Sequence, residues 1–80
     1  MESTSNRQLR AARALLAWEQ TDLCRAAGVS IGTIRRMESL DGPVRGQHET
    51  VLKVRAALES AGVEFLNGGV RVRQMAEASP

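Results

Sequence analysis

The sequence predicts a mainly α-helical domain, in which four helices are followed by a C-terminal β-hairpin. Apolar residues recur at spacings of three and four in four segments, and Gly, Pro or cap residues separate these segments. Apolar residues make up 42% of the chain, but only one Trp and one Phe are present. The core must therefore be aliphatic, which favours closely packed helices over a β-sandwich.

The first predicted helix covers residues 6–17 and contains neither Gly nor Pro. One face of it carries apolar residues at helical spacing, and we expect these in the core: Leu9, Ala12 and Leu16. The polar residues before it, 1–5, and the last residues, 74–80, are expected to be disordered tails. A single domain of about 70 residues remains between them.

Two shorter helices are predicted at residues 20–27 and 31–39. Gly28 stands where the first should stop, because a residue without a Cβ adopts the left-handed backbone at low cost. Ser30 then suits the cap of the next helix, where its hydroxyl accepts a hydrogen bond from a free backbone amide. Two short helices joined by such a tight turn predict a helix-turn-helix unit.

A loop rich in Gly and Pro, residues 41–46, precedes a fourth predicted helix over residues 49–61. Its apolar residues again share one face: Val51, Val54, Leu58 and Ala61. Gly62 ends this helix and completes a helical region over residues 6–62.

The last ordered segment, residues 63–73, is predicted to form a β-hairpin because Asn67-Gly68 is a strong turn signal. A loop of two or four residues pairs Phe65 with Val70, Glu64 with Arg71, and Val63 with Val72. One face is then apolar and the other carries a salt pair, whereas a three-residue loop would oppose Phe65 and Arg71.

An isolated two-stranded ribbon is marginal in water, so the hairpin must dock on the helices, join a partner's ribbon, or do both. A chain of 80 residues also gains stability from a second subunit. We therefore predict a homodimer in which the hairpin is the dimerisation element, with Phe65, Val70 and Val72 as its contacts.

The helix-turn-helix segment also carries a pattern of residues, Gln-x-x-Leu-x-x-x-Ala-Gly-Val-Ser-x-x-Thr-Ile-x-x-Met-Glu, over residues 20–38. This pattern resembles the signature of the Cro/C1-type (XRE) helix-turn-helix proteins, and the resemblance extends over about residues 7–73. It implies the lambda-repressor-like fold and the function of a short bacterial DNA-binding transcriptional regulator.

The resemblance implies that the helix at 31–39 enters the major groove of an operator. Ile31, Gly32 and Arg36 match the positions that read base edges, and Arg bidentate to guanine is the commonest specific contact. The residue that matches Gln20 holds a DNA phosphate in the family. We also expect phosphate contacts from residues of the third helix and the following loop: Thr33, Arg35 and Arg45.

Arg13 and Glu38 match a family pair that forms a partly buried salt bridge between the first and third helices. We expect this pair to be structural. Glu19 and Asp41 depart from the family pattern, because they place negative charge near the expected path of the DNA. The net charge of only +2 is also modest for a DNA-binding domain.

The leading functional prediction is a homodimeric, sequence-specific regulator that represses or activates transcription by occupying double-stranded DNA. The alternative is a protein–protein interaction module on the same scaffold, which modulates another regulatory protein and binds DNA little. Steep loss of binding with added salt would favour the first and salt-insensitive binding to a protein the second.

Other classes of function find little support in the sequence. No nucleophile–base pair or phosphate-cradling glycine loop is apparent, so we do not expect an enzyme. One His and one Cys make a metal site improbable, and we expect no cofactor. The chain shows neither a signal peptide nor an apolar run of membrane-spanning length, so we expect a cytoplasmic protein without membrane contact.

Overall fold

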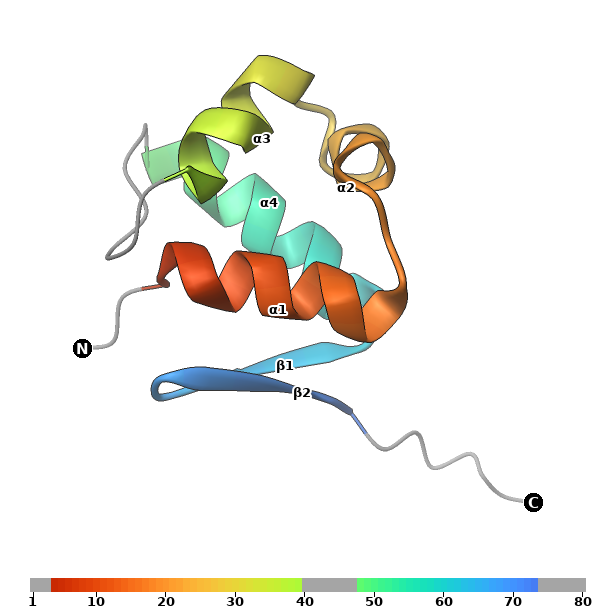
Figure 1. The fold of residues 1–80 in the computed structure, drawn as a ribbon, viewed down its shortest axis with the longest axis vertical. Helices are drawn as coiled ribbons and strands as arrows, with labels where there is room; N and C mark the ends of the chain where they lie inside the picture. Colours follow the sequence, from red (N-terminus) through yellow and green to blue (C-terminus); the bar gives the residue numbers. More distant parts are fainter. Residues whose placement is uncertain (1–3, 40–47, 74–80) are drawn as a thin grey trace.

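The computed structural model describes residues 4–39 and 48–73 of the chain, and it confirms the predicted fold class (Figure 1). The elements are α1 (Asn6–Leu16), α2 (Gln20–Ala27), α3 (Ile31–Glu38), α4 (His48–Ser60), β1 (Val63–Leu66) and β2 (Gly69–Val72). The helix ends differ from the predicted ones by about one residue, which is within the ordinary fraying of helix termini.

The prediction of a disordered tail over residues 1–5 extends too far, because Ser5 forms the N-cap of α1. The Ser5 hydroxyl accepts a hydrogen bond from the Gln8 backbone amide at 3.1 Å, and the Gln8 side chain accepts one from the Ser5 amide at 2.8 Å. This reciprocal capping box satisfies two backbone amides at once. Thr4 is also buried, so residues 4 and 5 pack with the domain, whereas the sequence predicted that they lie in the tail.

The turn between α2 and α3 forms as the sequence predicts. Gly28 adopts a φ of +72°, and its amide donates to the Cys24 carbonyl oxygen at 2.8 Å. Ser30 caps α3, since its hydroxyl accepts from the Thr33 amide at 3.2 Å. The two caps fix where α2 stops and α3 starts, and so they set the angle at which α3 leaves the domain.

The core is aliphatic and draws on all four helices and β1. Its buried apolar residues are Leu9, Ala12, Leu23, Ile34, Met37, Val54, Leu58, Val63 and Phe65. Trp18, at the junction of α1 and α2, and Cys24, on α2, are half-buried and pack against this core.

The hairpin has the predicted register, with Phe65 opposite Val70 and a 2.8 Å ion pair between Glu64 and Arg71. It packs on α1 and α4, and it lies on the side of α1 opposite to α3 (Figure 1). Val63 and Phe65 are buried in the chain's own core, while Val72 is 50% exposed. Of the predicted dimer contacts, Phe65 therefore already packs within one subunit.

Gln8 attaches the turn of the hairpin to α1. Its side-chain amide donates to the carbonyl oxygens of Leu66 at 2.7 Å and Gly69 at 2.9 Å. The side chain is buried, and so these two bonds hold a ribbon that would be marginal by itself.

Replacing Gln8 with Met keeps the length of the side chain but removes both donors. We expect Gln8→Met to lower the free energy of unfolding by about 1–3 kcal/mol, because both carbonyl groups lose a partner and the Ser5 amide loses its acceptor in the capping box. Chemical denaturation measures the change. Ala11→Met, at an exposed position of the same helix, is the control and should change stability by less than about 0.5 kcal/mol. Equal effects of the two variants would contradict the role assigned to Gln8.

Candidate nucleic-acid interface

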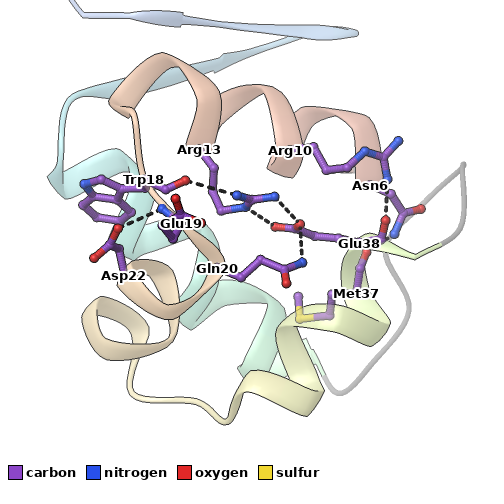
Figure 2. Close-up of polar contacts among 9 residues, drawn as sticks. All are labelled: Asn6, Arg10, Arg13, Trp18, Glu19, Gln20, Asp22, Met37 and Glu38. Atoms are coloured by element: carbon purple, nitrogen blue, oxygen red, sulfur yellow. Dashed lines mark hydrogen bonds and ion pairs between the residues drawn. The ribbon is translucent and has the colours of Figure 1, made fainter.

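A buried carboxylate connects the three helices that would form the interface. Glu38, at the end of α3, is only 4% exposed. Arg13 of α1 donates to both of its oxygens, from Nε to Oε2 at 2.8 Å and from Nη2 to Oε1 at 2.7 Å (Figure 2). This two-point geometry is the strongest form of the Arg–carboxylate pair, and it confirms the predicted salt bridge.

Gln20, the first residue of α2, joins the same carboxylate, since its Nε2 donates to Glu38 Oε1 at 3.0 Å. Arg13 also donates from Nη1 to the Trp18 carbonyl oxygen at 3.1 Å, which fixes the link between α1 and α2 (Figure 2). The hydrogen bond to Glu38 raises the pKa of Arg13 above its ordinary value, against the opposing effect of burial. The guanidinium therefore stays charged at every pH at which the protein would be studied.

The C-terminal end of α3 is held a second time by α1. The side-chain amide of Asn6 donates to the Met37 carbonyl oxygen, and the Arg10 guanidinium donates to the Glu38 carbonyl oxygen (Figure 2). Cationic and amide donors suit the last carbonyls of a helix, which lack partners within the helix. These contacts hold the inner side of α3, and Arg35 and Arg36 on its outer side are exposed in the part of the chain that the structure describes.

The outer side of α3 carries the residues that the sequence predicted for base readout. Arg36 is exposed, and Ile31 and Gly32 are half-exposed at the N-terminal turn. The Arg36 guanidinium extends back along the helix, because its Nη2 lies 3.4 Å from the Thr33 hydroxyl oxygen. A Cβ added at Gly32 would meet Arg36 Nη1 at 3.8 Å, so the guanidinium passes over Gly32.

The four predicted phosphate contacts differ in where the structure puts them. Arg35 is exposed on α3, next to Arg36. The Thr33 hydroxyl is 2.9 Å from the Ser30 hydroxyl, so it takes part in the cap of α3. The Gln20 side chain points toward Glu38 and donates one hydrogen bond to its carboxylate. Arg45 lies outside the described residues.

A polar hollow lies between the N-terminal ends of α2 and α3, and the predicted residues Gln20, Ile31 and Arg35 meet in it. Its lining is Arg13, Glu19, Gln20, Thr21, Ile31 and Arg35. Thr21 is exposed and was not predicted as a site residue. Its position directly after Gln20, in the first turn of α2, is the signal that could have identified it. Glu19 contributes the opposing negative charge that the sequence indicated.

Neither a metal site nor a membrane span is found in the part of the chain that the structure describes. No three His, Cys, Asp or Glu side chains come close enough there to hold a metal ion. None of the helices described is long and apolar enough to cross a bilayer.

Comparisons with protein-family models, with curated proteins and with solved structures found no match to this chain. The likeness to the Cro/C1-type proteins therefore remains a resemblance carried by the residues of the helix-turn-helix segment.

Replacing Glu38 with Gln preserves the shape of the side chain but leaves the guanidinium of Arg13, only 18% exposed, without its anion. We expect Glu38→Gln to lower the free energy of unfolding by about 2 kcal/mol or more, as measured by chemical denaturation.

The double variant Arg13→Met with Glu38→Gln serves as the control for this pair. The double variant should lose less free energy of unfolding than the two single variants lose together, because the ion pair is already broken by either single change. A loss below about 0.5 kcal/mol for Glu38→Gln would instead place the pair among ordinary surface ion pairs.

Proposed function

We propose that the protein is a DNA-binding transcriptional regulator that inserts α3 into the major groove. The main support for the proposal is that α3 has one buried side and one exposed, cationic side. Its inner side, Ile34, Met37 and Glu38, is buried, and its outer side presents Arg35 and Arg36 to solvent. A helix held rigidly on one side and cationic on the other suits a groove about 12 Å wide.

Base readout is assigned to the N-terminal half of α3. The backward course of Arg36 over Gly32 brings its guanidinium to the end of the helix that points toward the base edges in helix-turn-helix proteins. Arg36 is the residue assigned to a guanine, and Ile31 is assigned to a thymine methyl group. Gly32 has no side chain beyond its Cα, so the DNA can approach the backbone of α3 closely at this position.

Phosphate contacts are assigned to the hollow between α2 and α3. Gln20 and Thr21, at the N-terminal end of α2, line this hollow together with Arg35 of α3. The positive end of a helix dipole and an exposed guanidinium both attract a phosphate. Glu19 lies in the same hollow and opposes this attraction, so we expect moderate affinity that falls with salt.

We further propose that the regulator acts as a homodimer whose two α3 helices read half-sites about 34 Å, or one helical turn, apart. Dimerisation through the hairpin stays a prediction. Val72 remains available for it, at 50% exposure, whereas Phe65 is 8% exposed.

The first test is a mobility-shift titration with duplex DNA from the region upstream of the protein's own gene, at low and moderate salt. We expect a salt-weakened complex whose affinity falls about 10- to 100-fold in Arg36→Ala. Arg25→Ala removes an equally charged and exposed guanidinium from α2, outside the proposed interface, and should bind like the wild type. Absence of a complex at low salt, with the protein folded, would instead favour the protein–protein module.

A second experiment separates phosphate contacts from base readout. Arg35→Ala should weaken binding to cognate and random duplexes by a similar factor, and it should lower the slope of log affinity against log salt by about 1. Arg36→Ala should mainly reduce the difference between the two duplexes. A loss of sequence preference in Arg35→Ala would contradict the division of roles between these neighbours.

A further inference from the structure

Two hydroxyl groups connect the cap of α3 to the guanidinium of Arg36. The Ser30 hydroxyl accepts a hydrogen bond from the Thr33 backbone amide at 3.2 Å, which makes Ser30 the cap of the helix. The Thr33 hydroxyl lies 2.9 Å from the Ser30 hydroxyl on one side and 3.4 Å from Arg36 Nη2 on the other. A guanidinium can only donate hydrogen bonds, so the Thr33 oxygen is the acceptor in its contact with Arg36.

This contact distinguishes Arg36 from its neighbour Arg35, although both side chains are exposed. Within residues 4–39 and 48–73, no hydrogen bond or ion pair holds the Arg35 guanidinium. The Arg36 guanidinium is instead turned back toward the N-terminal turn of α3, where its Nη1 would lie 3.8 Å from a Cβ at Gly32. The absence of a side chain at Gly32 leaves this course open, and the Thr33 hydroxyl favours it.

The orientation of an arginine matters for base readout, because a guanidinium contacts O6 and N7 of guanine through two hydrogen bonds at once. Both bonds form only when the guanidinium plane has the correct angle, and an arginine that moves freely loses rotamer freedom when it binds. A side chain that already points in the binding direction loses less. Contacts to phosphates carry no sequence information, so a restraint on Arg36 bears on sequence preference.

We propose that Thr33 is a positioning residue for sequence readout, whose hydroxyl orients the Arg36 guanidinium toward a guanine of the operator. This role rests on the proposed function and extends it. It differs from the phosphate contact expected from the sequence, because the Thr33 oxygen is already engaged with Ser30 and Arg36. One exposed hydrogen bond of 3.4 Å biases a side chain without locking it, so the expected effect on affinity is about 3- to 10-fold.

Thr33→Val tests this role, because it removes the hydroxyl but keeps the size and branching of the side chain. The Thr33 backbone amide still donates to Ser30, so the variant should keep the cap of α3 and the circular dichroism of the wild type. We expect its affinity for duplex DNA from the region upstream of the protein's own gene to fall about 3- to 10-fold. Its affinity for a random duplex of the same length should stay unchanged. Thr33→Ser keeps the hydroxyl and should retain the sequence preference.

The same change in an Arg36→Ala background separates positioning from direct contact. Thr33→Val should have no further effect there, because the side chain that it orients is gone. Equal losses of affinity for both duplexes, persisting in the Arg36→Ala background, would overturn the proposal and make Thr33 a phosphate contact.

The orientation of Arg36 can also be measured without DNA. The heteronuclear NOE of the Arg36 Nε–H group should be higher in the wild type than in Thr33→Val, because the lost acceptor releases the guanidinium on the picosecond-to-nanosecond timescale. The Nε–H group of Arg35 is the control and should give the same value in both proteins. Equal values for Arg36 in the two proteins would overturn the proposal. If the wild type retards no DNA, the proposed function fails, and this comparison alone decides whether Thr33 orients Arg36.

Discussion

The arrangement of the helix-turn-helix depends on one buried carboxylate, that of Glu38. Arg13 of α1 and Gln20 of α2 converge on it, so a single side chain of α3 fixes its helix against both neighbours (Figure 2). A carboxylate this buried is tolerable only with a full set of partners, and the two-point contact with Arg13 supplies them. Without this carboxylate α3 would keep its apolar packing, its cap and the contacts from Asn6 and Arg10, but it would lose the group that joins it to Gln20 of α2.

This constraint connects structure to the proposed function. Two short helices joined by a three-residue turn bury few apolar residues of their own, so polar contacts add to the packing that holds their mutual angle. Holding α3 at its inner side allows its outer side to carry exposed guanidinium groups. The hollow that the helix N-termini form with Arg35 follows from the same geometry. Rigid presentation of a few side chains is what discrimination between base pairs requires.

Local patterns in the sequence predicted much of this arrangement. The Gly28 turn, the Ser30 cap and the hairpin register each depend on a few neighbouring residues, and all three were predicted. Contacts between polar residues far apart in the sequence were harder to predict, because no periodic pattern indicates which residues meet. The bonds from Gln8 to the hairpin join residues 58 and 61 positions apart. The sequence could not tell whether Phe65 packs in the core of its own chain or in a dimer interface, because both environments are apolar.

In the proposed function, α3 and the N-terminal end of α2 together form the surface that contacts DNA. Amide chemical shifts of the labelled protein, recorded while duplex DNA from its own upstream region is added, test this claim most directly. We expect the perturbed amides to be concentrated at Gln20, Thr21 and residues 31–36, while those of the hairpin strands stay unchanged. Perturbations confined to the hairpin or to α4, or none at low salt, would contradict it.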